Sequence, residues 1–200
     1  MNIPSHPSGS ESQPKENKQR ARRRFIHGVG VAVPVIMTVK SSSALAAQCF
    51  SPSAAASIAL LNSRVNHEYA DCSQGRTPGF WVNAANPTNG NSGKSNDNYQ
   101  YWQAAGGDGV YFSTAFVSGF TNLKLKQVMA LNGTDDPWQL GAHLSAAYLN
   151  NKIGWVPDTV VSLQDLRDTW AGRYGTYTPT AGVTWTGEQI VAYLQTTMPQ

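Results

Sequence analysis

The sequence predicts a mainly α-helical protein with a single small domain of about five helices and one long aromatic loop. Three segments in its second half combine a helix cap with apolar residues at helical spacing. No segment alternates apolar and polar residues over the length of a strand, and only 110–112 has a short piece of strand character. A chain of 200 residues that is 40% hydrophobic also suits one globular core.

Residues 1–46 have the order of an export signal. A polar stretch, 1–20, leads to the basic run Arg22-Arg23-Arg24, then to the apolar run 28–39 and to the small residues Ala44-Leu45-Ala46. Basic, apolar and small residues in this order are typical of a signal peptide that is cleaved after an A-x-A site. The sequence therefore predicts a signal peptide with a polar extension over 1–46 and a mature exported domain over 47–200.

The basic part of this leader resembles the twin-arginine motif. Arg22 and Arg23 are followed by Phe25 and Ile26, although Ala21 stands where that motif has Ser or Thr. The alternative is a general secretory signal that is rich in arginine. Twelve apolar residues in a helix span only about 18 Å, against about 30 Å of membrane hydrocarbon, so we expect no stable membrane span.

The net charge of +3 comes from the leader. Seven cations and two anions precede residue 47, which leaves eight cations against ten anions in 47–200. The remaining cations are scattered, with Lys124 and Lys126 as their one close pair. Since nucleic-acid binding needs clustered cations, nucleic acid is excluded as a partner.

The two cysteines, Cys49 and Cys72, both fall in the exported part, where a disulfide between them is expected. A loop of this length stabilises by about 3 kcal/mol in the chain-entropy model. A functional thiol pair is the alternative, but there is no C-x-x-C and the spacing does not suit zinc.

The exported part begins with a helix and continues into the long loop. Ser51 and Pro52 read as a cap and a first helical position, and the helix is expected to run to about Val65. Over 73–109, turn-forming Gly, Asn, Ser, Asp and Pro dominate. Within this loop, 77–80 fits a type II turn with positive φ at Gly79.

Helices are expected from there to the end of the chain. The first spans 123–131 and is closed by Asn132-Gly133. The second is capped by Asp135 or Asp136, with Pro137 at its first position, and ends near Gly154. A capping box at Ser162 opens the third, which runs toward Trp170. The last follows Thr186 and stops at Pro199.

The stretch Cys72-Ser-Gln-Gly-Arg-Thr-Pro-Gly-Phe-Trp-Val-Asn resembles a motif of exported bacterial proteins, in which a Cys precedes Thr-Pro-Gly-Tyr/Phe-Trp-Lys-Asn-His. Segments similar to 140–150 and 184–194 follow in the same order in that group, so the resemblance covers most of 47–200. Val82 and Ala84 replace the usual Lys and His. The resemblance implies a secreted or surface domain with no assigned reaction.

Catalytic signatures are missing from the sequence. His67 is expected at a solvated helix end, while His143 reads as a partly buried histidine or, with Asp136, as the site of a small extracytoplasmic hydrolase. Asp97 and the Asp135-Asp136 pair offer oxygen ligands of the kind that calcium takes, but neither has the EF-hand pattern. We therefore expect no cofactor, with calcium as the alternative.

The aromatic loop is the strongest functional lead. Exposed rings can stack on the apolar C–H faces of sugars, while amide side chains bind the hydroxyls. The candidate ligand-binding residues are Trp81, Tyr99, Tyr101, Trp102 and Asn83. The alternative is that these rings fold back onto the helical core, as tryptophan usually does, and it is favoured for Trp81.

These observations predict an exported protein of the periplasm, the cell surface or the medium. Its expected role is non-enzymatic: it binds a glycan or an envelope or surface protein, or it is a matrix component. The hydrolase around His143 is the competing hypothesis.

Overall fold

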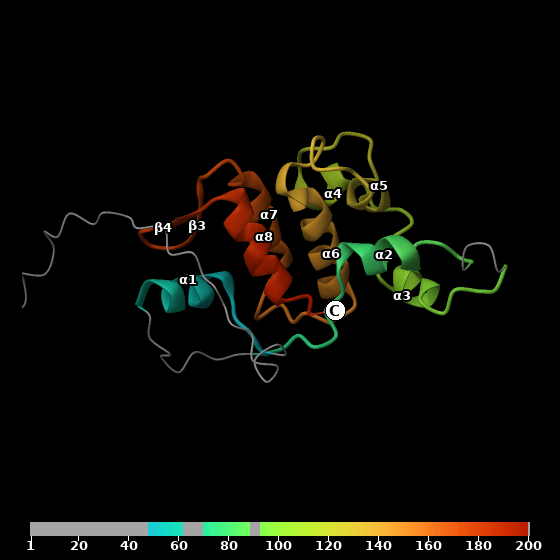
Figure 1. The fold of residues 1–200 in the computed structure, drawn as a ribbon, viewed down its shortest axis with the longest axis horizontal. Coiled ribbons are helices and arrows are strands. Elements are labelled where there is room, and N and C mark those ends of the chain that lie inside the picture. The colour runs from blue at the N-terminus through green and yellow to red at the C-terminus, as the bar shows by residue number, and fades with distance from the viewer. Residues whose placement is uncertain (1–47, 62–69, 89–92, 200) are drawn as a thin grey trace, which may run out of the picture. The chain divides into compact units, whose positions relative to one another are not determined.

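Helix α6 (Leu140–Lys152) lies in the middle of the helical core (Figure 1). The computed structural model describes residues 48–61, 70–88 and 93–199, all within one compact unit. Four helices pack against α6: α2 (Pro78–Ala84), α5 (Leu125–Met129), α7 (Leu163–Ala171) and α8 (Gly187–Thr196). Because neighbours surround it, most of α6 is buried, including the polar residues Ser145 and Asn150.

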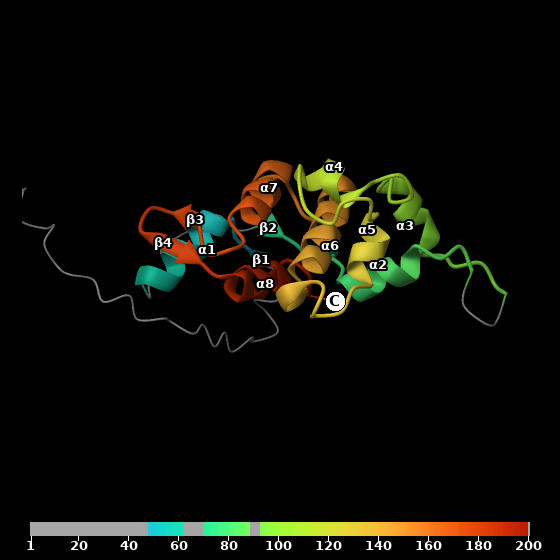
Figure 2. The same ribbon diagram turned by 90° about the horizontal axis from the view of Figure 1, so that it is seen from above.

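Shorter elements complete the fold around this core. They are the helices α1 (Pro52–Leu61), α3 (Tyr99–Ala104) and α4 (Phe112–Phe116), and a 3₁₀ turn, η2 (Pro137–Gln139). Two antiparallel strand pairs accompany them, β1 (Gln48–Cys49) with β2 (Ala70–Asp71) and β3 (Tyr177–Thr180) with β4 (Val183–Trp185). Helix α1 packs against β3 (Figure 2).

The mainly helical prediction is confirmed, and several predicted helix ends lie where the caps indicate. Ser162 accepts the backbone N–H of Asp165, whose carboxylate accepts the N–H of Ser162 in return. Thr186 caps α8 in the same way with Gln189. Helix α6 ends just before Gly154, which has φ +76°. Local hydrogen bonds therefore set these boundaries, as the sequence indicates.

The predicted loop over 73–109 is wrong in part, because it contains α2 and α3. With α4, they raise the count to eight α-helices in the described residues, instead of about five. The type II turn is also wrong: Thr77 caps α2, Pro78 is its first residue, and Gly79 has no positive φ. Over 110–112, Tyr111 forms a single bridge with Lys124 rather than a strand.

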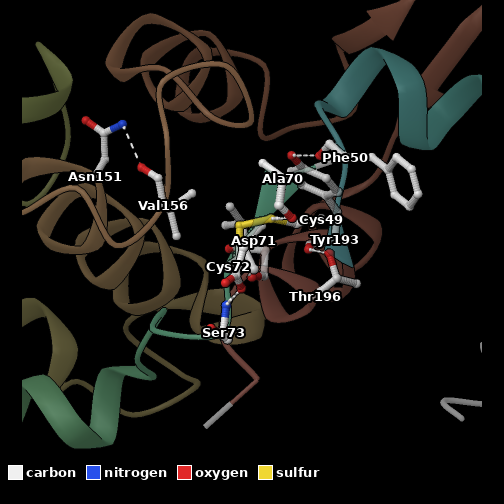
Figure 3. The surroundings of a disulfide bond; sticks show 12 residues. Cys49, Phe50, Ala70, Asp71, Cys72, Ser73, Asn151, Val156, Tyr193 and Thr196 are labelled. Atoms are coloured by element: carbon white, nitrogen blue, oxygen red, sulfur yellow. Dashed lines mark hydrogen bonds between the residues drawn. A yellow bond between two sulfur atoms is a disulfide. The ribbon is translucent and has the colours of Figure 1, made fainter. Parts of the chain in front are cut away.

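The predicted disulfide between Cys49 and Cys72 is confirmed (Figure 3). It joins Cys49 of β1 to Cys72, the residue that follows β2, with 6.0 Å between the two Cα atoms, and both side chains are buried. Next to it, the Tyr193 hydroxyl of α8 donates to the carbonyl of Phe50 at 2.8 Å. The N-terminal strand is thus fixed to the C-terminal helix as well as to β2.

Three sequence predictions lie outside the described residues: the leader over 1–46, the end of the first helix near Val65, and His67. Over the described ranges, no helix has both the length and the apolar character needed to cross a membrane.

Candidate functional site

The segment 72–81, here called the strap, carries the chain from the disulfide to helix α2. It begins with a tight turn in which the Gly75 N–H donates to the carbonyl of Cys72. A Cβ atom on Gly75 would overlap the backbone carbonyl of Thr197, so only glycine lets the strap approach the end of α8 this closely. The strap is therefore held at its start by a covalent bond and by close backbone packing.

Asn150 holds the other end of the strap. Its side chain is fully buried, and its Oδ1 accepts the Arg76 backbone N–H and the Trp81 indole N–H, each at 3.0 Å. Its Nδ2 donates to the carbonyl of Arg76 at 2.9 Å. One amide thus satisfies three polar groups of the strap, which fixes both the backbone at Arg76 and the ring of Trp81.

Four side chains around the strap form an aromatic surface with one cation: Arg76, Phe80, Tyr101 and Trp155. The Trp155 ring centroid lies 5.9 Å from that of Phe80 and 5.0 Å from that of Tyr101. The Arg76 guanidinium carbon lies 5.4 Å from the Trp155 centroid and 5.7 Å from that of Phe80. Tyr101 is 38% exposed, and the other three are half-buried. We call this set the aromatic–arginine surface.

Asn150 also positions Trp155, the ring in the middle of this surface. Its backbone carbonyl accepts the Trp155 N–H at 2.9 Å, just after Gly154 ends α6. The side chain of Asn150 orients Arg76, and its backbone orients Trp155. The geometry of the surface thus depends on one buried asparagine at the end of the central helix.

The structure separates the five candidate residues that the sequence indicated. Trp81 and Trp102 are buried in the core, and the Trp102 indole donates to Asp108 at 2.7 Å. Neither ring is free to stack on a ligand, so their assignment as ligand-binding residues is corrected. They lie inward because each indole N–H has a partner within the fold.

The other three candidates are closer to solvent. The Tyr99 hydroxyl donates to Asp108 at 3.3 Å. Asn83 is exposed, and its backbone and side-chain oxygens accept the Asn96 amide at 2.9 and 3.3 Å. Only Tyr101 belongs to the aromatic–arginine surface, which joins it to three residues that the sequence did not indicate as binding residues.

Asp136 serves as the cap of α6. It is almost fully buried, and its two carboxylate oxygens accept the backbone N–H groups of Gly141 and Ala142, each at 2.9 Å. The chain reaches this position through Trp138 and Gln139, which both have left-handed φ, 59° and 56°. The sequence-predicted cap is therefore present, but a strained 3₁₀ turn separates it from the helix.

His143 is half-buried rather than sealed in the core. Its Nδ1 lies 2.8 Å from the carbonyl oxygen of Gln139, and its Nε2 lies 3.4 Å from the Gln195 amide nitrogen. Both oxygens of the neighbouring Asp136 already serve the cap. In the part of the chain that the structure describes, no hydroxyl or acid hydrogen-bonds to His143, so its geometry offers no nucleophile for the hydrolase hypothesis.

Asp136 makes stability depend on pH in a direction opposite to that of a salt-bridged carboxylate. Burial raises its pKa above the ordinary 3.8, against the lowering effects of the two backbone N–H groups and His143. The stabilisation that comes from the protonated Asp136 carboxyl is therefore fully present below the pKa of the unfolded chain. It is lost as the pH rises through the pKa of the folded protein. We expect that lowering the pH from about 7 to about 4 shifts the unfolding free energy of the wild type upward relative to Asp136→Asn.

Urea unfolding at a series of pH values measures this difference. Asp135→Asn, at the exposed neighbouring carboxylate, is the control and should show no such shift relative to the wild type. If the unfolding free energy of wild type, relative to that of Asp136→Asn, increases toward neutral pH, the raised pKa of Asp136 is contradicted.

A hollow of about 600 Å³ lies apart from this cap, between the start of α1, α7 and β3. Its lining includes Ser51, Ser53, Asp165, Asp168 and Tyr177. Asp165 is committed to the cap of α7, and Asp168 accepts the amide of Gln164. Within the described ranges, no three His, Cys, Asp or Glu side chains gather as metal ligands.

No family model, no curated protein and no solved structure matches this chain.

Proposed function

We propose that this chain is an exported extracytoplasmic domain that binds glycan through the aromatic–arginine surface. The observation that carries the proposal is the Tyr101 ring, which stays 38% exposed while it packs on Trp155. A ring held by a second ring is a rigid apolar platform, and little entropy is lost when a sugar stacks on it. Asn83 lies on α2 three residues after Phe80, on the same side of the helix, and can supply a polar side chain.

Export is supported by the disulfide and by the order of residues in the leader. Disulfides persist outside the cytoplasm and are rare within it. The leader favours the twin-arginine route, with general secretion as the alternative. A protein partner would use the same side chains, because Tyr, Trp and Arg carry most binding energy in interfaces. The test therefore includes an arm for protein partners.

The binding proposal is tested with Tyr101→Ala. We expect wild-type protein, purified from cells that express the full chain, to bind members of a glycan array, and Tyr101→Ala to weaken that binding about fivefold or more. The reason is the loss of the exposed part of the platform, since the backbone of α3 is unaffected. Tyr174→Ala is the matched control, because Tyr174 is 79% exposed but lies between α7 and β3.

Three outcomes separate the alternatives. A blank array, or equal binding by the wild type and Tyr101→Ala, contradicts glycan binding at this surface. Capture of an envelope protein that is lost in Tyr101→Ala, together with a blank array, favours a protein partner. Equal loss in Tyr174→Ala shows that the effect is not specific to the aromatic–arginine surface.

A further inference from the structure

We infer that the glycan bound at the aromatic–arginine surface carries carboxylate groups, as a uronic-acid polymer does. This inference rests on the proposed function and adds the chemical class of the ligand. It depends on Arg76, whose charge belongs to the surface but has no role in the packing of the core.

The backbone of Arg76 is fixed on both sides of the residue. Its N–H and its carbonyl both bond to Asn150, and Thr77 then caps α2. Its guanidinium lies over the rings of Phe80 and Trp155, and Nη1 approaches the carbonyl of Ser73 at 3.4 Å. A cation held in this way has lost most of its rotamer freedom before a ligand arrives, which favours binding.

The guanidinium has no anionic partner within the described residues. Three of the carboxylates that are close in sequence to Arg76, Tyr101 or Trp155 are committed to other groups. Asp71 accepts the Ser73 N–H, Asp108 accepts the Trp102 indole and the Tyr99 hydroxyl, and Asp158 accepts the amide of Asn151. Guanidinium has five N–H donors and stays charged at all physiological pH values, so most of its donors remain for a ligand.

Arg76 and Tyr101 share a contact with the Trp155 ring, and this arrangement favours a sugar whose own ring bears a carboxylate. The Tyr101 ring centroid lies 5.0 Å and the Arg76 guanidinium carbon 5.4 Å from the Trp155 centroid. A pyranose that stacks on Tyr101 can therefore place a ring carboxylate near the guanidinium, which accepts carboxylates in a bidentate geometry. An acidic peptide would satisfy Arg76 but would not require a stacked ring, and it is therefore an outcome of the test.

A second stacked arginine provides a matched control. Arg173 lies between Trp170 and Tyr174, with its guanidinium carbon 4.0 and 4.3 Å from their ring centroids. It has the same chemistry as Arg76 but lies at the end of α7, away from the strap. A general attraction between cations and polyanions would involve both arginines, whereas a site at the aromatic–arginine surface involves Arg76 alone.

The experiment compares oligogalacturonate with its methyl ester, which has the same sugar ring but no charge. Titration calorimetry with purified wild type, Arg76→Lys, Tyr101→Ala and Arg173→Lys measures both affinities, and poly-glutamate serves as an anion without sugar. We expect wild type to bind the acid form about tenfold more tightly than the ester. Arg76→Lys keeps the charge but loses the bidentate geometry, so it should reduce this preference to about threefold. Tyr101→Ala should weaken both affinities, and Arg173→Lys should match wild type.

The outcomes distinguish this inference from the proposed function. If acid and ester bind equally and Tyr101→Ala weakens both, glycan binding stands and the acidic ligand is wrong. The acidic ligand is also wrong if neutral glycans of the array bind and oligogalacturonate does not. If poly-glutamate binds as well as oligogalacturonate and only Arg76→Lys weakens it, the surface is a simple anion site. If neither oligogalacturonate nor any array glycan binds wild type, both proposals fail. Unchanged melting temperatures of Arg76→Lys and Tyr101→Ala exclude unfolding as the cause of a loss.

Discussion

Replacing Asn150 by Ala is expected to lower the free energy of unfolding by about 4 kcal/mol, which is a large part of the 5–15 kcal/mol typical of a domain. The substitution removes three hydrogen bonds at once. It leaves the indole N–H of Trp81 and the N–H and carbonyl of Arg76 without partners in a largely dry environment. Each such group costs about 1–3 kcal/mol, and a water molecule in the gap does not reproduce the geometry of a planar amide. Urea unfolding monitored by tryptophan fluorescence measures the loss.

Asn98→Ala is the matched control. Asn98 precedes α3, and its side chain makes no capping hydrogen bond there, so we expect a change within about 1 kcal/mol. Asn150→Ala should also weaken binding at the aromatic–arginine surface, because Arg76 and Trp155 both depend on this residue. A variant with wild-type stability would show that the three bonds contribute little to the fold.

Removing the disulfide with Cys49→Ala and Cys72→Ala together is expected to lower the unfolding free energy by about 3 kcal/mol, or the melting temperature by about 10 °C. The two residues are 23 positions apart, and the bond closes this loop in the unfolded chain. Alanine avoids the burial of two new hydroxyl groups at these positions. Thermal unfolding with and without dithiothreitol measures the effect.

The double variant also provides the control for the reductant. Wild type should lose stability when dithiothreitol is added, and the variant should not respond. Identical melting curves of the wild type in both conditions would mean that the bond is absent or without effect, and would remove the support it gives to export.

Helix ends were predictable where a cap and an apolar face coincide. Ser162 forms its capping box as expected, Thr186 caps the last helix, and Asp136 caps α6. These signals are local, since each involves a side chain and a backbone group a few residues apart. The eight α-helices of the described residues exceed the expected five because α2, α3 and α4 have five to seven residues each, too short for a periodic pattern.

Helix α2 shows how one residue changed the prediction. Thr77 and Pro78 are the same signal as Ser51 and Pro52, which correctly predicted α1. Gly79 favoured a turn instead, because glycine often supplies positive φ. In the structure the indole N–H of Trp81 donates to Asn150 in the core. This tertiary contact stabilises a helix that Gly79 alone would disfavour.

The aromatic–arginine surface was only partly predictable, because its members come from separate parts of the chain. Tyr101 was a candidate from the composition of its segment. Trp155 lies far from it in sequence, and nothing in the spacing around Gly154 indicates that its ring meets Tyr101. Arg76 also looked like one of several scattered cations. Asn150 bonds to the backbones of both Arg76 and Trp155, and its side-chain partners Trp81 and Arg76 lie 69 and 74 positions away in sequence.

The bond between Tyr193 and Phe50 brings together the two ends of the part of the chain that the structure describes. Residues near both ends of the described structure meet there, because β1 lies beside α8 and the strap passes the backbone of Thr197 (Figure 3). A longer polypeptide would enter and leave such a domain at one place, which is the geometry that tolerates insertion into a host protein and circular permutation.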